Sequence, residues 1–438
     1  MTTSAQAMSY DPAGEAVHIL QELIRIDSTN FGDERGPGER AAAEYVAGLL
    51  DEVGIPSQLF ESEKGRTSVI ARWGGEVGDG VLMHGHLDVV PAEASDWTHH
   101  PLSGAIVDGC IWGRGAVDMK DFDAMLLSVV RARARAGAVP SRPIVLAFVA
   151  DEETGGSLGA QWLVDHHREL LEGCTVAIGE AGGFSTTVRD RRMYLIQTAE
   201  KGMAWMRLTA KGGAGHGSHL QPHNTVARLA RAVTRLADYE WPVRLTPTSQ
   251  VLLAAVADIA GAEATPENAS SLIEEFGPSA RMLGATLRNT ANPTMLQAGD
   301  KLNTVPSAAT AYVDGRILPG YEDEFYGTVA SLVGDDIEVD WVTQLTAVEA
   351  QVQGRVVDAM QASLNAFDPD ATTAPFMISG GTDAKHFSRL GMHCYGFAPL
   401  KLPAEFDFNA LFHGVDERVP VESIEFGSRV IDDFFDRY

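Results

Sequence analysis

The chain is poor in cysteine, with three in 438 residues. Cys110, Cys174 and Cys394 lie far apart in the sequence, and none belongs to a Cys-x-x-Cys pair. We therefore expect no disulfide framework, and this usage is typical of a protein from a reducing compartment. A chain of this length can bury a large core without such cross-links. Its length predicts two or three domains, at about 150 residues each.

Long hydrophobic runs are also absent. No stretch of about 18 apolar residues occurs, so no transmembrane helix is expected. The N-terminus reads Met-Thr-Thr-Ser-Ala-Gln and has no basic stretch followed by an apolar run, so we expect no signal peptide. These features predict a cytoplasmic protein without a membrane partner.

Positive charge is scarce relative to negative charge. The chain has 34 lysines and arginines against 60 aspartates and glutamates, which gives a formal net charge of −26. Nucleic acids and anionic membranes attract basic patches, so neither is expected as a partner. The acidic excess does not identify a cationic substrate, because such an excess is usually a solvated surface.

Two kinds of apolar pattern alternate in the first 180 residues. Apolar residues at helical spacing predict helices in two pieces within 14–54, and at 119–136 and 157–167. Short apolar runs predict strands at 68–71, 81–83, 143–150 and 176–179. Because strands alternate with helices, we expect an α/β domain with a mainly parallel sheet flanked by helices.

The pattern changes near residue 200. Alternating apolar and polar residues predict a half-exposed strand at 204–209. An apolar stripe at helical spacing predicts a helix at 223–237, and two further strands are predicted at 293–302 and 308–317. Further helices are predicted at 322–333, 351–366 and 421–437. We therefore expect an inserted α+β domain at 200–317, between the two parts of the α/β domain at 1–199 and 318–438.

Histidine and acidic side chains follow several predicted strands. Residues 84–88 read His-Gly-His-Leu-Asp, so His86 could bind a metal, and Asp88, on the same side of an extended chain, could orient its imidazole. Residues 151–153, Asp-Glu-Glu, end an apolar strand where like charges repel each other, and metal binding or proton transfer would explain them. Glu180 follows another strand. Ligand sites in open α/β sheets lie at the carboxyl ends of strands, so these side chains should lie together.

Each signal has an ordinary alternative. A histidine in a loop usually meets solvent, and three acids can form a solvated turn. Asp118 follows a glycine-rich segment and opens a helix, so it could be a plain N-cap. A carboxylate there could instead bridge two cations about 3.5–4 Å apart. Mixed histidine and carboxylate ligands suit zinc, cobalt or manganese better than copper(I) or an iron–sulfur cluster.

Taken together, these segments resemble the zinc-dependent exopeptidases and deacylases that include aminoacylase, carboxypeptidase G, acetylornithine deacetylase and succinyl-diaminopimelate desuccinylase. The order and spacing match over nearly the whole chain. The matching segments are residues 83–91, 113–120, 151–153 and 413–417. The resemblance implies a hydrolase that cleaves an amide bond in N-acyl amino acids or short peptides with a free carboxylate. The shared chemistry leaves carboxypeptidase, dipeptidase and N-deacylase open.

The resemblance also implies two zinc ions per chain, with cobalt or manganese as possible substitutes. His86 and Glu180 would share one ion. Glu153 and His413 would share the other, and Asp118 would bridge both.

The same resemblance implies roles around the metals. Glu152 would be the general base that acts on a zinc-activated water, and Asp88 would orient His86. A cis peptide bond would follow Asp118.

In the inserted domain, residues 215–218 resemble a lid motif whose histidine, His216, polarises the substrate carbonyl, often from a partner subunit. The resemblance therefore implies a lid and a homodimer formed through this domain. A proline falls at Pro222, later than is usual after the motif's serine. The alternative is a glycine-rich turn with a solvent-exposed histidine.

Three further elements resemble substrate-binding parts. Asn303 resembles a substrate-contacting asparagine. Arg316 resembles an arginine that binds a substrate carboxylate through its planar fork, the alternative being a strand-surface charge. Residues Gly380, Gly381 and Thr382 resemble a backbone-binding loop, the alternative being a helix-opening turn.

Two rival functions stay open. A catalytically silent metal-binding or regulatory protein of the same fold would have lost Glu152 or a ligand, and neither is missing. A serine hydrolase would need a Gly-x-Ser-x-Gly elbow, which occurs at 155–159. Four residues, Asp151 to Thr154, separate this motif from the preceding strand, so we expect Ser157 to open the helix at 157–167 instead.

Overall fold

The computed structural model describes residues 12–33, 35–75 and 78–438. The described chain divides into two compact units. Unit 1 contains the described residues up to Thr198 together with Ala350–Pro375 and Thr382–Tyr438. Unit 2 contains Ala199–Glu349 and Phe376–Gly381.

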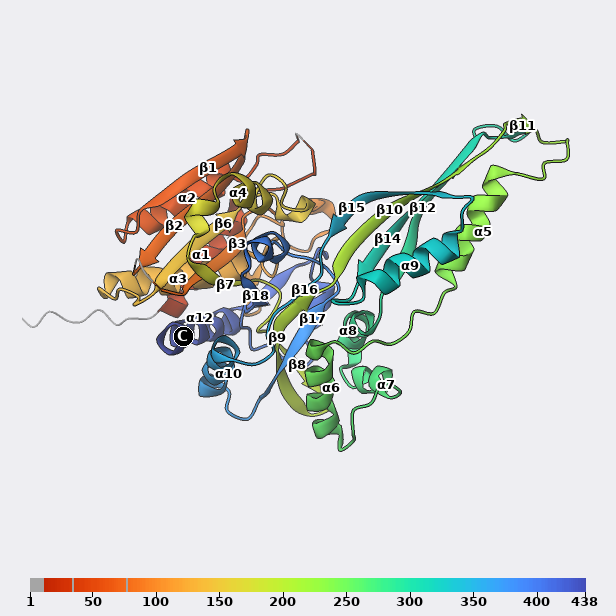
Figure 1. Cartoon of the computed structure of the whole chain (residues 1–438). Helices are drawn as coiled ribbons and strands as arrows, with labels where there is room; N and C mark the ends of the chain where they lie inside the picture. Colours follow the sequence, from red (N-terminus) through yellow and green to blue (C-terminus); the bar gives the residue numbers. More distant parts are fainter. Residues whose placement is uncertain (1–11, 34, 76–77) are drawn as a thin grey trace, which may run out of the picture. The chain divides into compact units, whose positions relative to one another are not determined.

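Unit 1 is built on a mixed sheet whose central strands are parallel (Figure 1). Strand β3 pairs in parallel with β6 and β7, and β18 continues the parallel set beside β7. Antiparallel strands flank this centre: β2 lies beside β6, β1 lies beside β2, and β9 lies beside β18. The strands of this sheet that lie within unit 1 are β1 (Ser57–Glu63), β2 (Arg66–Gly74), β3 (Gly80–His86), β6 (Pro143–Val149), β7 (Cys174–Gly179), β8 (Ser185–Val188) and β18 (His393–Gly396). Strands β4 (Ala105–Val107), β5 (Cys110–Trp112) and β19 (Arg418–Pro420) form a separate three-stranded sheet. Strands β9 (Arg191–Glu200) and β17 (Thr372–Ile378) run from one unit into the other.

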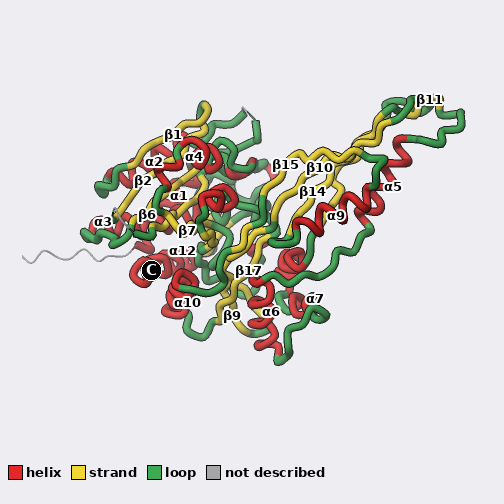
Figure 2. Tube along the Cα trace, viewed as in Figure 1, coloured by secondary structure: helices red, strands yellow, loops and turns green. Residues whose placement is uncertain are grey.

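Helices pack on this sheet and on one another, and Figure 2 shows them in red beside the yellow strands. Helices α1, α3 and α12 contact each other, and α2 contacts β1 and β2. Strand β6 is buried at all seven positions, which accounts for its unbroken apolar sequence. The helices are α1 (Pro12–Arg25), α2 (Arg40–Asp51), α3 (Lys120–Arg135), α4 (Ala160–His166), α10 (Arg355–Phe367), α11 (Ala384–Phe387) and α12 (Val421–Arg437).

Unit 2 contains a separate antiparallel sheet in the order β12-β14-β10-β15. Helices α5 and α9 pack against each other, and their apolar residues join the core of this sheet. The strands are β10 (Gly202–Lys211), β11 (Gly215–His216), β12 (Thr290–Ala298), β13 (Thr304–Val305), β14 (Ala308–Ile317), β15 (Glu338–Leu345) and β16 (Val348–Glu349). The helices are α5 (Thr225–Ala237), α6 (Pro247–Ala260), α7 (Ala269–Glu274), α8 (Ala280–Gly284) and α9 (Glu322–Val333). The predicted fold class, an α/β sheet domain with an α+β insertion, is confirmed.

The second unit reaches farther than the predicted boundary at residue 317. Strand β15 pairs with β10 and so completes the antiparallel sheet. Helix α9 contributes Phe325 and Val329 to its core. The sequence indicates the helix correctly but does not show that its apolar face packs on the sheet of the insertion.

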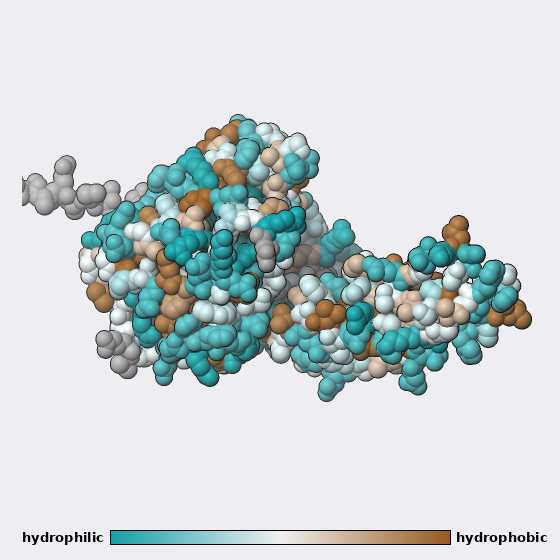
Figure 3. All heavy atoms as spheres, turned by 90° about the horizontal axis from the view of Figure 1, so that it is seen from above, coloured by the Kyte–Doolittle hydropathy of each residue, from teal (hydrophilic) through white to brown (hydrophobic). Residues whose placement is uncertain are grey.

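No helix among the described residues is both long and apolar enough to cross a membrane. Most of the face seen in Figure 3 is hydrophilic, as expected for a chain with a net charge of −26. Brown apolar residues are scattered over this face singly or in small groups.

The glycine between the two histidines of β3 permits a close approach of helix α3. A Cβ on Gly85 would lie 2.0 Å from the Oδ1 atom of Asp123. Gly85→Ala must therefore displace the buried side chain of Asp123, and we expect the free energy of unfolding to fall by about 1–3 kcal/mol in urea denaturation. Gly48→Ala in α2 is the matched control, because no atom lies within 4 Å of its Cβ position. It should leave stability unchanged or raise it, and equal losses in both variants would contradict this packing.

Candidate functional site

The carboxyl ends of three parallel strands gather acidic and histidine side chains at one edge of the unit 1 sheet. His86 is the last residue of β3, and Glu180 directly follows β7. Glu152 and Glu153 open the 3-10 helix η2 (Glu152–Thr154), which follows β6. Asp118, which lies just before α3, is also at this edge of the sheet.

Two groups of side chains are arranged so that each could hold a metal ion. One contains His86, Asp118 and Glu180, and the other contains Asp118, Glu153 and His413. Within each group the ligand atoms lie within 4.8 Å of one another. The structure therefore brings all five predicted ligands together, with Asp118 common to both groups.

The shared carboxylate turns one oxygen toward each group. Oδ1 of Asp118 lies 3.1 Å from Nε2 of His86, and Oδ2 lies 3.2 Å from Nε2 of His413. The second histidine also lies 3.0 Å from Oε2 of Glu153, and the first lies 3.7 Å from Oε2 of Glu180. This is the arrangement that a carboxylate bridging two cations requires.

Burial and mutual repulsion shift the pKa values of these groups. Burial, with the charge of Glu180, raises the pKa of Glu152 well above its usual range. Burial, with the charge of Asp118, raises the pKa of Glu153 to about 7. Hydrogen bonds that His413 donates to the carboxylates of Asp118 and Glu153 raise the pKa of His413 to about 10. The site therefore favours positive charge on its histidines and disfavours negative charge on its glutamates.

A divalent cation fits this set of donors. Oε1 of Glu153 is buried and has no hydrogen-bond partner among the described residues. A buried oxygen without a partner is costly unless something else compensates it. Bound cations would also relieve the repulsion among the carboxylates, and carboxylate with imidazole is a donor set that zinc accepts.

A model of the peptidase family M20/M25/M40 matches residues 82–437. The chain belongs to this family. The resemblance noted from the motifs is thereby confirmed.

The chain aligns with known proteins over nearly its whole length. It is 27% identical to succinyl-diaminopimelate desuccinylase of Paracoccus denitrificans, with 98% of this chain and 99% of that protein aligned. It is 26% identical to the N-fatty-acyl-amino acid synthase/hydrolase PM20D1 of Xenopus tropicalis, with 94% and 83% aligned. Its fold is similar to that of an M20 family metallo-carboxypeptidase from Sulfolobus solfataricus, with a TM-score of 0.72, 20% identity, and 97% and 99% coverage.

The backbone around the site is unusual in ways that the family resemblance anticipates in part. The peptide bond between Asp118 and Met119 is cis, as expected. Asp151 and His413 both have left-handed backbone conformations, with φ of 69° and 57°. Non-glycine residues in this region cost energy and persist only where surrounding contacts hold them.

The contact between Asp88 and His86 differs from the prediction. Nδ1 of His86 lies 2.9 Å from the main-chain oxygen of Asp88, whereas the nearest carboxylate oxygen is 3.6 Å away. The ring is thus oriented by a carbonyl group. The carboxylate of Asp88 instead accepts hydrogen bonds from the main-chain N–H groups of Glu152 and Glu153.

A buried ion pair that the sequence did not single out ties two ligand segments together. Nη1 of Arg114 donates to Glu417 at 2.6 Å, and Nη2 donates to the carbonyl of His413. Glu417 also accepts from the N–H groups of Val117 and Asp118. Both residues stand within the motif segments quoted above, but only the fold shows that they meet.

Asp383 is a second buried acid that was missed. It is 3% exposed, and burial raises its pKa well above the usual range, with His86 and Glu180 among the charges that act on it. The motif that resembles a backbone-binding loop, residues 380–383, ends at this residue, but no role was assigned to it. Its position in that motif was the sequence signal that could have indicated a role at the site.

His216 and Asn303 lie together in unit 2. Strand β11 pairs His216 with Thr304 of β13, and the N–H of Gly217 donates to the carbonyl of Asn303 at 2.7 Å. The hydroxyl of Ser218 lies 2.8 Å from Nδ1 of His216. The paired strands β11 and β13 lie at one end of unit 2, beyond α5 (Figure 1).

The other predicted substrate contacts have partners within their own segments. The guanidinium of Arg316 forks onto the carboxylate of Asp314, at 2.7 and 3.1 Å. Thr382 accepts from the N–H of Ala384 and so opens α11, while Gly380 and Gly381 belong to unit 2. Their substrate-binding roles stay predictions.

Ser157 does not open a helix, contrary to our expectation. Helix α4 begins at Ala160, with Gly159 as its N-cap residue. The Ser157 hydroxyl instead donates to Asp151 at 3.2 Å. The turn at 155–159 therefore belongs to the loop around Asp151.

Breaking the Arg114–Glu417 pair should lower the stability of the fold by an amount that depends on pH. Burial raises the pKa of Glu417 to about 7 although Arg114 opposes the shift, and Arg114→Met removes that cation and raises the pKa further. The folded state then binds more protons than the unfolded state, so the destabilisation grows as pH rises through the folded pKa and is relieved below it. We expect a loss of about 3–5 kcal/mol near pH 8.5 and a clearly smaller loss near pH 5.5 in denaturant titrations.

Arg389→Met is the matched control, because Arg389 pairs with Asp165 at the surface, with side chains 49% and 35% exposed. It should cost less than about 1 kcal/mol at either pH. A loss in Arg114→Met that does not change with pH would contradict the buried-charge explanation.

Proposed function

We propose that the chain is a two-metal hydrolase that cleaves an amide bond in N-acyl amino acids or short peptides bearing a free carboxylate. The observation that carries this proposal is the pair of histidine–carboxylate groups joined through Asp118. The relatives support the substrate class, because they include an N-fatty-acyl-amino acid synthase/hydrolase and a succinyl-diaminopimelate desuccinylase. The similar solved structure is named as a metallo-carboxypeptidase.

His86 and Glu180 would hold one cation, and Glu153 and His413 the other, with Asp118 between them. Zinc is the proposed metal, with cobalt or manganese as possible substitutes. Bound divalent cations would polarise the substrate carbonyl and lower the pKa of water at the site. The side chain of His413 is 55% exposed, which leaves this end of the site open to solvent.

Glu152 is the proposed general base. One of its carboxylate oxygens lies 3.8 Å from Nε2 of His86, so it borders the metal-binding groups. The carboxylate would take a proton from the attacking water as the new C–O bond forms. It would then give that proton to the amine nitrogen as the amide C–N bond breaks.

Unit 2 would supply contacts to the rest of the substrate. His216 would polarise the substrate carbonyl, and Asn303 would contact the substrate beside it. Arg316 would bind the substrate carboxylate, which must compete with Asp314 for the guanidinium fork. Gly380, Gly381 and Thr382 would bind the substrate backbone.

We further propose that unit 2 closes as a lid and forms a homodimer. A cytoplasmic location is proposed as well, and it is supported by the three cysteines, none of which forms a disulfide bond.

The test is a panel of N-acyl amino acids and dipeptides, assayed with zinc, cobalt and manganese. We expect turnover that is lost with a chelator, and about two metal ions per chain by elemental analysis. Glu152→Gln should lower kcat by about 10²–10⁴-fold while both metals are retained, because it removes the proton acceptor and leaves the ligands in place. Glu169→Gln, at a side chain that is 62% exposed, is the matched control.

Wild-type turnover by Glu152→Gln, or activity that survives complete metal removal, would overturn this mechanism. Full metal occupancy without turnover of any substrate in the panel would favour the silent metal-binding protein.

A further inference from the structure

The turn that carries Glu152 is held by a carboxylate from another strand. Oδ1 of Asp88 accepts from the N–H of Glu152, and Oδ2 accepts from the N–H of Glu153, both at 3.1 Å. The N-cap residue of this turn, Asp151, makes no side-chain cap of its own. Asp88 therefore satisfies N–H groups at the start of η2 that would otherwise be unpaired.

Asn30 connects this carboxylate to the far side of the turn. Its side-chain nitrogen donates to Oδ2 of Asp88 at 2.9 Å and to Oδ1 of Asp151 at 3.3 Å. All three side chains are buried, with Asn30 3% exposed. One amide group thus links two buried carboxylates that repel each other.

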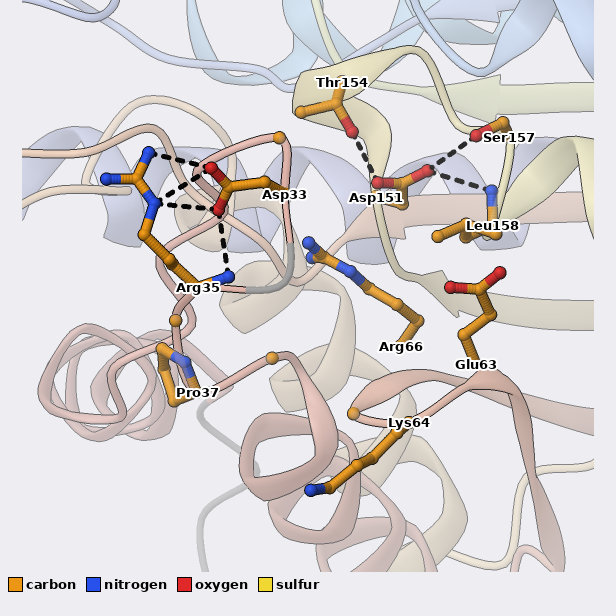
Figure 4. A pocket seen from close by; sticks show the side chains of 14 residues that line it. Asp33, Arg35, Pro37, Glu63, Lys64, Arg66, Asp151, Thr154, Ser157 and Leu158 are labelled. Carbon is orange, nitrogen blue, oxygen red and sulfur yellow. Dashed lines mark hydrogen bonds and ion pairs between the residues drawn. The ribbon is translucent and has the colours of Figure 1, made fainter.

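The side chain of Asp151 holds the rest of the loop, residues 154–158, by hydrogen bonds. Its carboxylate accepts from the hydroxyls of Thr154 and Ser157 and from the N–H of Leu158 at 2.9 Å, as Figure 4 shows. Its own backbone is left-handed, with φ of 69°. The side-chain bonds therefore hold a backbone conformation that most residues avoid.

Two donors fix which way the Asn30 amide faces. Nη2 of Arg66 donates to Oδ1 of Asn30 at 2.8 Å, and the N–H of Gly32 donates to the same oxygen at 3.0 Å. Nη1 of Arg66 donates to Glu39. A guanidinium can only donate hydrogen bonds, so the amide must turn its oxygen to Arg66 and its nitrogen to the carboxylates. Arg66 and Asp151 both line the 740 Å³ pocket drawn in Figure 4.

We propose that Asn30 is a positioning residue for the general base, oriented by Arg66 and acting through Asp88 and Asp151 on the turn that begins with Glu152. This inference rests on the proposed function. Asn30 touches neither substrate nor metal in this scheme. Its effect is to fix the direction in which the Glu152 side chain leaves the backbone.

The test is steady-state kinetics of the zinc-loaded full-length Asn30→Ala enzyme. Displacing a catalytic group by about 1 Å can cost about 10²-fold in rate, so we expect kcat to fall by about 10- to 100-fold. KM should stay within about threefold, because the substrate contacts are unchanged. Metal content should stay at about two ions per chain. The solvent deuterium isotope effect on kcat should rise, because proton transfer to a misplaced base becomes slower.

A second variant and a control separate positioning from general stability. Arg66→Lys removes the second donor arm of the guanidinium and should give the same kinetic pattern, even if Asn30→Ala does not fold. Asp368→Asn disrupts another buried cluster of unit 1, with Arg192, Tyr194 and Lys401. It should lower stability without changing kcat or the isotope effect.

Wild-type kcat and isotope effect in the folded Asn30 and Arg66 variants, with Glu152→Gln inactive, would overturn the positioning role alone. Loss of metal in proportion to activity would overturn it too. Wild-type activity in Glu152→Gln would instead overturn the proposed function.

Discussion

The Asp118 carboxylate faces one histidine through each of its oxygens, and the rest of the site is arranged around that contact. His86 comes from a central strand of the sheet and His413 from a loop near the end of the chain, so they can share a carboxylate only if both segments are held against the start of α3. Glu417 holds the His413 segment there by accepting from the N–H of Asp118 while Arg114 binds both Glu417 and the carbonyl of His413. The repulsion that remains among the buried glutamates is what bound cations would relieve.

Some side chains of the site can bind a metal ion, and others hold the backbone in place. Asp88 shows why the two are easily confused. Its position two residues after His86 favours a carboxylate–imidazole contact, yet its main-chain oxygen contacts the ring and its carboxylate caps η2. A single residue thereby fixes both a proposed ligand and the proposed base, and the buried chain of Asn30 and Arg66 continues that support toward the surface.

Much of this architecture could be predicted, because parallel strands end at one edge and strand-end residues must therefore meet there. That rule correctly placed His86, Glu153 and Glu180, and the family resemblance supplied Asp118 and His413. The Arg114–Glu417 pair could not be derived, since pairing across some 300 residues leaves no periodic signal. Helix α6 was overlooked although Thr246 caps it and Pro247 opens it, a recognised start signal. The end of unit 2 was misplaced because β15 belongs to the insertion through strand pairing, and sequence periodicity does not show pairing.

Anomalous diffraction at the zinc edge, from crystals of the zinc-loaded protein, would test the shared-carboxylate arrangement most directly. We expect two peaks about 3.5–4 Å apart, one beside His86 and Glu180 and one beside Glu153 and His413, with Asp118 between them. A single peak, or two peaks that do not share Asp118, would contradict the central claim that this carboxylate joins two metal ions.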